Sequence, residues 1–321
     1  MKLVAGTRGS KLAVAQTELI CSMLEKEFPD LEIEKKIIKT KGDKILNKAL
    51  DKIGDKGLFV KEIESQLESG EIDFAVHSLK DMPSEINSSL KLTKTPDRAD
   101  ARDILIINPK HKINNVMDWL KREKSIKIGT GSKRRIAQLL EINENIEPMH
   151  IRGNIDTRIR KLVEEDMDAI VLAAAGVERL KIENLNTYIF KYDEMIPAAG
   201  QGALAIEIKK ENIILDKMFD KISEIESEVQ ITAERAFLKR INGGCHSPVG
   251  AISEIDGDEL ILKAIYGDEE YKYIFKNETR TKIGNIHSED VEICVKKAEN
   301  AGIELADMLI EKTVEIKELE R

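Results

Sequence analysis

Residues 243–248 form a glycine-bearing segment that contains Cys245, one of three cysteines in the chain. Two glycines remove side-chain bulk and a closing proline ends regular structure, so the thiol is expected on an exposed loop. An exposed thiol is a candidate nucleophile or attachment point, unless it is a bystander that merely tolerates solvent. Cys21 and Cys294 lie on the apolar stripes of expected helices, where a free cysteine is normally inert. His246 is a weaker candidate for a base, because neighbouring side chains of an extended chain point opposite ways.

A second cluster of polar residues follows an apolar strand expected at 72–76. Polar groups at the carboxyl end of a buried strand reach the crevice where ligands bind in α/β sheets. Asp81 could stabilise a cation there and carry a proton. Ser78 and Lys80 could hold an anion, whereas His77 alone is more often a structural histidine.

Arginine is concentrated in one part of the chain. Six of the 14 arginines fall within 46 residues that contain a single lysine, and they are Arg134, Arg135, Arg152, Arg158, Arg160 and Arg179. The rigid guanidinium fork matches carboxylate or phosphate geometry, so the segment indicates a ligand with several anionic groups. The alternative is a set of surface ion pairs with Glu141, Glu164, Glu165 and Asp166.

Two similar turns indicate two lobes. Residues 6–10 read Gly-Thr-Arg-Gly-Ser and residues 129–132 read Gly-Thr-Gly-Ser, and each lies between an expected strand and an expected helix, the first capped by Ser10. A glycine turn that opens a helix presents free N–H groups to anions, although many such turns are only tight loops. Together they predict two lobes that face each other across an anion-binding cleft.

Short apolar strands alternate with helical patterns through the first two hundred residues, which is typical of an α/β protein. Strands are expected at 3–6, 31–40, 72–76, 104–107, 126–129, 149–151 and 169–174, and helices from Ser10, at 60–67, 132–140 and 155–164. A polar loop is expected at 41–57. After residue 224 the pattern becomes that of a small α+β domain, with helices at 229–241 and 288–313 and strands at 249–253, 259–266 and 271–276.

The elements predict three domains. The first takes residues 1–101 with about 200–219, the second residues 102–199, and the third residues 220–321 with the Cys245 loop.

Composition limits the partners. The chain of 321 residues holds 51 Lys and Arg against 59 Asp and Glu, a formal charge of −8, which argues against nucleic-acid and membrane partners. It has no apolar run of about 18 residues and no signal-peptide pattern, and its scattered cysteines exclude a disulfide framework or a Cys-rich zinc site. We expect a cytoplasmic protein without a bound metal.

Seven motifs in a fixed order give the chain a resemblance to the porphobilinogen deaminases. They occupy residues 6–10, 54–62, 77–83, 129–135, 152–158, 197–202 and 243–245. The resemblance implies two lobes like those of a periplasmic binding protein and a small third domain. It also implies a transferase, a hydroxymethylbilane synthase, that joins four porphobilinogen molecules head to tail into the linear tetrapyrrole hydroxymethylbilane, releasing ammonia at each step.

The resemblance further implies a dipyrromethane cofactor, bound by a thioether to Cys245. The family's product passes to uroporphyrinogen-III synthase, and a monomer is expected. Acetate and propionate groups on each pyrrole would explain the concentration of arginine.

Residue by residue, the resemblance makes Asp81 the catalytic carboxylate. The residues implied to bind the cofactor, besides Cys245, are Arg8, Ser10, Lys80, Ser132, Arg134, Arg135, Arg158 and Arg179. Those implied to bind substrate are Arg8, Arg152, Arg158, Gln16, Ser78, Gln201, and Lys56 and Phe59 in a mobile loop. Gly131, Lys133 and His246 depart from the residues common in the family.

Two other functions stay open on the sequence alone. A non-catalytic anion-binding protein on the same two lobes would keep the arginines but would not need Asp81 or Cys245. An RNA-binding protein could use the arginines on phosphates, but the negative charge and the absence of aromatic residues from the arginine-rich segment count against it.

Overall fold

The computed structural model describes residues 1–40, 60–241, 247–268, 270–287 and 291–319. The expected loop at 41–57 and the predicted site residues Lys56, Phe59 and Cys245 lie outside the described residues. Within the described ranges, no helix is long and apolar enough to cross a membrane.

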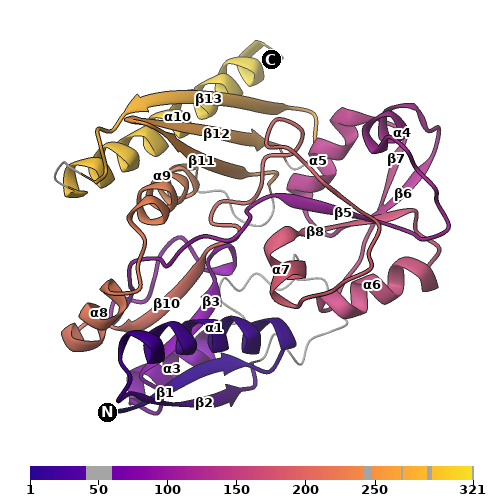
Figure 1. The fold of residues 1–321 in the computed structure, drawn as a ribbon. Helices are drawn as coiled ribbons and strands as arrows, with labels where there is room; N and C mark the ends of the chain where they lie inside the picture. Colours follow the sequence, from indigo (N-terminus) through magenta and orange to yellow (C-terminus); the bar gives the residue numbers. More distant parts are fainter. Residues whose placement is uncertain (41–59, 242–246, 269, 288–290, 320–321) are drawn as a thin grey trace.

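The first lobe is a five-stranded sheet in the order β2-β1-β3-β10-β4 (Figure 1). Its strands are β1 (Lys2–Arg8), β2 (Glu32–Ile38), β3 (Phe74–Ser78), β4 (Leu90–Leu92) and β10 (Leu204–Lys209). β1 runs parallel to β2 and β3, whereas β10 returns from far along the chain and pairs antiparallel with β3 and β4. The sequence analysis predicted no strand at β10. Its pairing partners β3 and β4 lie more than 100 residues earlier in the chain, so no local pattern identifies them.

Helices cover both faces of this sheet. They are α1 (Lys11–Glu27), α3 (Lys61–Ser69) and α8 (Ile213–Asp220). Alternate residues of β3 point to opposite faces, so Phe74 packs in the core with α1 and α8 while Ala75 packs with Ile63 and Leu67 of α3. α3 ends at Gly70, whose φ of 76° is the left-handed conformation common after helices.

The second lobe has the sheet order β7-β6-β8-β5-β9. Its strands are β5 (Asp103–Ile107), β6 (Ile126–Gly129), β7 (Ile146–Met149), β8 (Ala169–Ala173) and β9 (Thr187–Ile189), and its helices are α4 (Val116–Arg122), α5 (Lys133–Ile142), α6 (Ile155–Glu164) and α7 (Ala174–Arg179). β5 and β8 are buried along almost their whole length, and apart from Asp103 their residues are all apolar.

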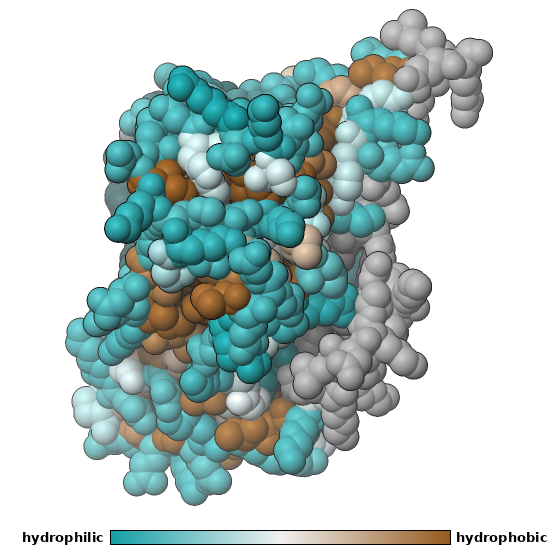
Figure 2. All heavy atoms as spheres, turned by 90° about the vertical axis from the view of Figure 1, so that its right-hand side faces the viewer, coloured by the Kyte–Doolittle hydropathy of each residue, from teal (hydrophilic) through white to brown (hydrophobic). Residues whose placement is uncertain are grey.

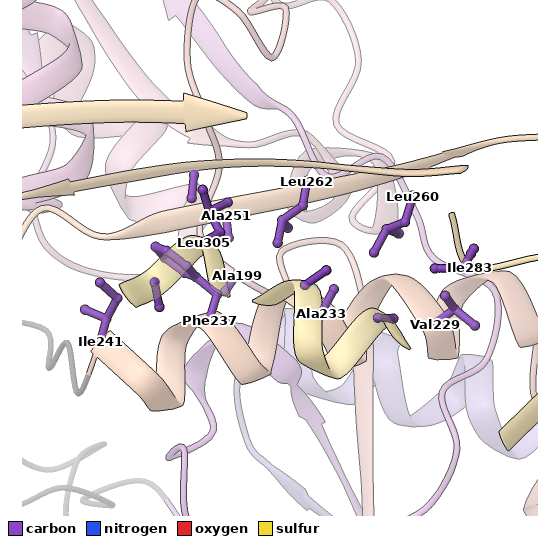
Figure 3. Close-up of a cluster of buried hydrophobic side chains, with 14 of the residues drawn as sticks. Ala199, Val229, Ala233, Phe237, Ile241, Ala251, Leu260, Leu262, Ile283 and Leu305 are labelled. Atoms are coloured by element: carbon purple, nitrogen blue, oxygen red, sulfur yellow. The ribbon is translucent and has the colours of Figure 1, made fainter. Parts of the chain in front are cut away.

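The third domain packs two helices against a three-stranded antiparallel sheet (Figure 3). The helices are α9 (Ile225–Ile241) and α10 (Val291–Leu319), and the strands are β11 (Gly250–Asp256), β12 (Glu259–Gly267) and β13 (Ile274–Lys282). Phe237 of α9 and Leu305 of α10 lie in its core with Leu262 of β12. Gly302 lets the helices approach closely, since a Cβ there would lie 2.2 Å from the carbonyl oxygen of Ala233.

The predicted fold class, two α/β lobes with a small α+β domain, is confirmed, and three of the predicted strands need correction. The strand expected at 72–76 is β3, Phe74–Ser78, because the Ile72 N–H still bonds to the Gln66 oxygen at the end of α3. The strand expected at 149–151 lies at β7, Ile146–Met149, because β7 is an edge strand and therefore tolerates Pro148. The strand expected from 271 begins at Ile274, since Tyr271 has a φ of 60° and belongs to the preceding turn. The last helix extends past the expected residue 313.

Glu234 of α9 joins the third domain to the segments that connect the lobes. Its carboxylate accepts two hydrogen bonds from Arg98, at 2.6 and 3.0 Å, and one from the Gly200 N–H at 2.7 Å. The Ser253 N–H of β11 donates another at 2.9 Å. This buried contact therefore fixes α9 relative to the segments that connect the two lobes.

The surface seen in Figure 2 is mostly hydrophilic, with hydrophobic side chains in scattered patches. Singly exposed residues such as Val163 are ordinary for a globular protein.

Candidate active site

Lys80 and Asp81 lie where β3 ends. β3 continues directly into a single turn of 3-10 helix, η2 (Leu79–Asp81), closed by a hydrogen bond from the Met82 N–H to the Leu79 oxygen at 3.0 Å. Leu79 is buried and anchors the turn, Lys80 is half-buried, and Asp81 is exposed. The turn therefore presents a cation and a carboxylate at the carboxyl end of a buried strand, as the sequence predicts.

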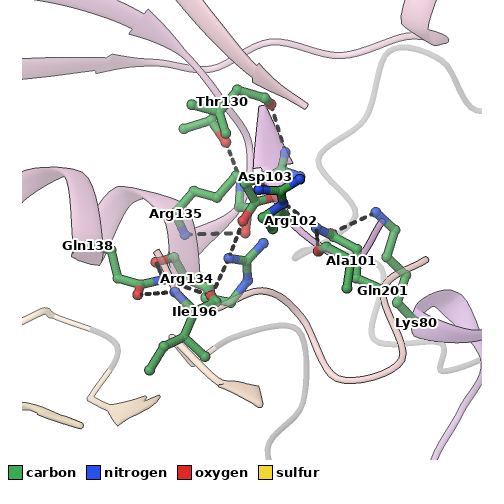
Figure 4. Close-up of polar contacts among 12 residues, drawn as sticks. Lys80, Ala101, Arg102, Asp103, Thr130, Arg134, Arg135, Gln138, Ile196 and Gln201 are labelled. Atoms are coloured by element: carbon green, nitrogen blue, oxygen red, sulfur yellow. Dashed lines mark hydrogen bonds and ion pairs between the residues drawn. The ribbon is translucent and has the colours of Figure 1, made fainter. Parts of the chain in front are cut away.

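A hydrogen-bonded chain connects Lys80 to the second lobe (Figure 4). The Lys80 ammonium donates to the side-chain oxygen of Gln201 at 3.2 Å. The Gln201 amide nitrogen donates to the Ala101 carbonyl oxygen at 2.7 Å and to Asp103 Oδ1 at 3.0 Å. Gln201, expected to bind substrate, thus also links a residue of the first lobe to the first residue of β5.

Asp103 is buried and binds two of the predicted arginines. Arg135 donates to its Oδ1 from Nε at 3.0 Å and from Nη2 at 2.8 Å, and Arg134 Nη1 donates to its Oδ2 at 2.7 Å. Burial alone would raise the pKa of Asp103, but the two guanidinium groups and Gln201 hold it well below its ordinary value. Arg134 and Arg135 also donate to the backbone oxygens of Ile196 and Val171.

Sequence reasoning missed Asp103. The available signal was a carboxylate beginning a strand whose other residues are all apolar, because a buried charge needs a partner. The role of Arg134 and Arg135 towards a ligand stays a prediction, and in this structure both side chains bind Asp103.

Positive charge surrounds the end of β3. Burial lowers the pKa of Lys80 to about 8, nearby Asp81 and Asp103 oppose this, and Arg134 and Arg135 add to it. Charged side chains of both lobes therefore act on Lys80.

Arg158 of α6 interacts electrostatically with Asp81. Burial lowers the pKa of Arg158, Asp81 opposes that effect, and Arg152 adds to it. Arg158 Nε donates to the Gly153 oxygen at 2.8 Å, which holds the guanidinium at the start of α6.

The two glycine turns place two serines at helix starts. Ser10 Oγ accepts the Ala13 N–H at 3.2 Å, and Ser132 Oγ accepts the Arg135 N–H at 3.4 Å. Each hydroxyl still has its own proton to donate to a ligand. The predicted N-cap at Ser10 is confirmed.

A pocket of about 160 Å³ lies between the lobes. It is lined by residues 9–12 at the start of α1, by residues 154–157 at the start of α6, and by Leu180. Lys11 and Asp156 form an exposed ion pair of 2.6 Å between these helix starts. Among the residues that line it are those of the first glycine turn but not of the second, at 129–132, so an anion-binding cleft flanked by both turns stays a prediction.

Three further predicted residues gather at the same sheet edge. Gln16 of α1 donates to Ser78 Oγ at 2.9 Å, and Arg8 ends β1, which pairs with β3. Gln16 is buried and Ser78 half-buried, so α1 holds them beside Lys80. Carboxyl ends of neighbouring parallel strands meet at one edge, which brings Arg8 there.

Arg179 and Arg152 are held in different ways. Arg179 Nη2 donates to the Gly202 oxygen at 2.6 Å, and its buried Nε has no hydrogen-bond partner among the described residues. Arg152 Nε donates to His150 Nε2 at 2.7 Å. A carboxylate oxygen of a ligand would accept the hydrogen bond that the Arg179 Nε–H does not make to the described residues.

Arg160 fits the alternative interpretation of the arginine-rich segment, because it forms an ion pair on the surface. It contacts Glu164 at 3.4 Å, with both side chains exposed. The other acids named for that alternative pair with lysines: Glu141 with Lys276, Glu165 with Lys161 and Asp166 with Lys110.

Two family models cover almost all of the chain. Residues 3–217 match "Porphobilinogen deaminase, dipyromethane cofactor binding domain", and residues 229–311 match "Porphobilinogen deaminase, C-terminal domain". This chain belongs to the porphobilinogen deaminase family. Family members are hydroxymethylbilane synthases, transferases that condense porphobilinogen into hydroxymethylbilane in tetrapyrrole biosynthesis.

Individual relatives agree with the family models. The chain is 45% identical to the porphobilinogen deaminase of Clostridium novyi over 315 residues, which covers 97% of this chain and 99% of that protein. It is 48% identical to that of Clostridioides difficile over 274 residues, 85% of this chain and 89% of that protein. Among solved structures, an arginine transport system periplasmic binding protein of Legionella pneumophila aligns over 69% of this chain and 92% of its own, at 13% identity and a TM-score of 0.36.

Proposed function

We propose that this chain joins four porphobilinogen molecules head to tail, with loss of ammonia at each step, on a dipyrromethane cofactor attached through Cys245. The observation that carries the proposal is the position of Asp81, exposed at the end of β3 beside Lys80 and Arg158. A carboxylate held among cations can stabilise a positive charge that forms beside it.

The residues present fit a cofactor that carries several carboxylates. The buried, unpartnered Nε of Arg179 and the free hydroxyl protons of Ser10 and Ser132 are donors suited to carboxylate oxygens. The proposed cofactor-holding residues, with Cys245, are Arg8, Ser10, Lys80, Ser132, Arg134, Arg135, Arg158 and Arg179. When bound, the cofactor supplies the free pyrrole carbon to which the first substrate is joined.

The proposed role of Asp81 is to stabilise the substrate as it loses ammonia. The aminomethyl nitrogen is protonated, the carbon–nitrogen bond breaks, and its electron pair leaves with ammonia, so the substrate's pyrrole ring becomes cationic. The Asp81 carboxylate, hydrogen-bonded to the pyrrole N–H, stabilises that charge in a site otherwise rich in Arg and Lys. The free pyrrole carbon that the cofactor would supply would form the new carbon–carbon bond, and the proton displaced from that carbon would leave to restore the aromatic ring.

The remaining polar residues orient the substrate. We assign this role to Arg8, Arg152, Arg158, Gln16, Ser78 and Gln201, together with Lys56 and Phe59 outside the described residues. Fixed contacts to the acidic side chains hold the reacting carbons near each other, which lowers the entropic part of the barrier.

The enzyme is proposed to act as a monomer in the cytoplasm and to pass hydroxymethylbilane to uroporphyrinogen-III synthase. The acidic formal charge of −8 is consistent with the absence of nucleic-acid and membrane partners.

Mass spectrometry of the intact protein, with and without porphobilinogen, tests the function. We expect discrete additions of one pyrrole unit at a time, with ammonia released in step. A protein that binds porphobilinogen reversibly, gains no covalent mass and releases no ammonia would instead be the non-catalytic anion-binding protein.

A further inference from the structure

Two ionisable side chains that have no role assigned above are buried together in the first lobe. His77 of β3 and Glu207 of β10 lie with Nε2 and Oε2 3.3 Å apart, and their side chains are 6% and 0% exposed. Within the described part of the chain, neither carboxylate oxygen of Glu207 nor His77 Nε2 has a hydrogen-bond partner. A buried ionised carboxylate without a hydrogen bond is costly, so the histidine beside it is its natural counter-charge.

The charged groups around this contact come from three elements. Glu64 of α3 is half-buried beside it, and burial and the neighbouring Glu207 raise the pKa of Glu64, whereas His77 lowers it. Glu68 and Lys61 of the same helix act on Glu64 more weakly. Among the described residues no cluster of His, Cys, Asp or Glu is arranged to hold a metal ion.

The contact joins the two strands whose ends carry the proposed site. Ala205 of β10 lies opposite His77 in the antiparallel ladder, and Leu204 lies opposite Ser78. Beyond this ladder, β3 leads into Lys80 and Asp81, and β10 is preceded by Gln201, the hydrogen-bond acceptor for Lys80. The His77–Glu207 contact therefore braces β3 against β10 four residues before Asp81.

We propose that protonated His77 and ionised Glu207 form a buried ion pair that positions Lys80 and Asp81 relative to Gln201. His77 and Glu207 are positioning residues in this account, because their effect on the reaction passes through the end of β3. The proposal rests on the role of Asp81 given above. A small displacement of a group that acts on the transition state lowers kcat more than it changes substrate binding.

The charge of His77 is measured in the wild-type protein by ¹⁵N NMR of its imidazole at pH 7. The chain has five histidines, so loss of one resonance in His77→Gln assigns the signal. We expect both ring nitrogens of His77 to carry protons in wild type and in Glu64→Gln, and one of them to lose its proton in Glu207→Gln. A neutral His77 in the wild type would overturn the proposal.

Turnover is measured with the same variants of the cofactor-loaded enzyme. For Glu207→Gln, we expect kcat to fall about tenfold or more with KM near the wild-type value, at a temperature where circular dichroism shows it folded. Glu64→Gln is the matched control, because it neutralises a neighbouring acid but leaves the His77–Glu207 pair intact. Its kcat should equal that of the wild type. Unchanged kcat in folded Glu207→Gln would contradict the proposal.

A double variant separates positioning from simple destabilisation. His77→Gln/Glu207→Gln places two amides, which can bond each other, where the charges were, and it should recover kcat relative to Glu207→Gln. Recovery of thermal stability without recovery of kcat would overturn the positioning role. The NMR result is independent of Asp81: an imidazolium at His77 together with normal turnover in Asp81→Asn would remove the catalytic assignment and leave the ion pair standing.

Discussion

Arg135 and Asp103 are joined by two hydrogen bonds to one carboxylate oxygen, with Nε 3.0 Å and Nη2 2.8 Å from Oδ1. Both side chains are almost fully buried. Arg134 reaches the other carboxylate oxygen, and Gln201 reaches Oδ1 as well, so one carboxylate organises two guanidinium groups and the link to Lys80.

Replacing that carboxylate should destabilise the protein. Asp103→Asn keeps the shape but leaves two buried guanidinium groups without their counter-charge, and we expect a loss of about 3–5 kcal/mol in the free energy of unfolding. Urea denaturation measures it. Asp156→Asn is the control, because the exposed Lys11–Asp156 pair should contribute about 1 kcal/mol or less. Equal losses in the two variants would show that Asp103 is not the organising group.

Lys80 should leave a signature in the pH dependence of stability. Its pKa falls from 10.5 to about 8 on folding, chiefly through burial. Between these values the unfolded chain binds more protons than the folded one, so this residue makes stability rise with pH across the window from about 8 to 10.5. Lys80→Gln lacks that contribution, and the wild type should gain stability relative to it as the pH rises.

Denaturation of both proteins at several pH values between 7 and 10.5 gives the comparison. Lys127→Gln removes an exposed lysine instead and should follow the wild-type pH dependence. If the difference in free energy of unfolding between wild type and Lys80→Gln stays constant over this range, folding does not lower the pKa of Lys80.

Cys245 is expected to carry the cofactor. Cys245→Ala should retain no pyrrole adduct, since a thioether needs the sulfur, whereas Cys21→Ala and Cys294→Ala should keep it. Intact mass before and after denaturation measures the adduct. The buried positions of Cys21 and Cys294, and the pKa of Cys21 raised to about 11 mainly by burial, make both poor nucleophiles. An adduct that persists in Cys245→Ala would move the attachment elsewhere.

Local signals predicted those parts of the fold and site that depend on few neighbours. Ser10 caps a helix, and Asp81 follows a buried strand, because each is determined within a few residues. Asp103 and Glu234 were missed, since their arginine partners lie far away in sequence and no local pattern identifies them. Pro148 suggested a break, but whether it can lie in a strand depends on that strand being at the edge of the sheet.

The resemblance and the structure supply different parts of the site. The family resemblance pointed to Gln16, Ser78 and Gln201 without showing how their side chains are held. The structure shows that each is fixed by a hydrogen bond to another element, and that Arg160 is a surface residue outside the set.

The most direct test of the central claim is the rate of ammonia release by Asp81→Asn, compared with wild type and with Asp166→Asn, which alters an exposed acid outside the proposed site. The variant loses the negative charge while keeping the shape of the side chain, so we predict a folded protein that retains its cofactor and turns over about 10²-fold more slowly or worse. Asp166→Asn should turn over at close to the wild-type rate. Near-normal ammonia release by Asp81→Asn would contradict the claim that this carboxylate stabilises the cationic substrate.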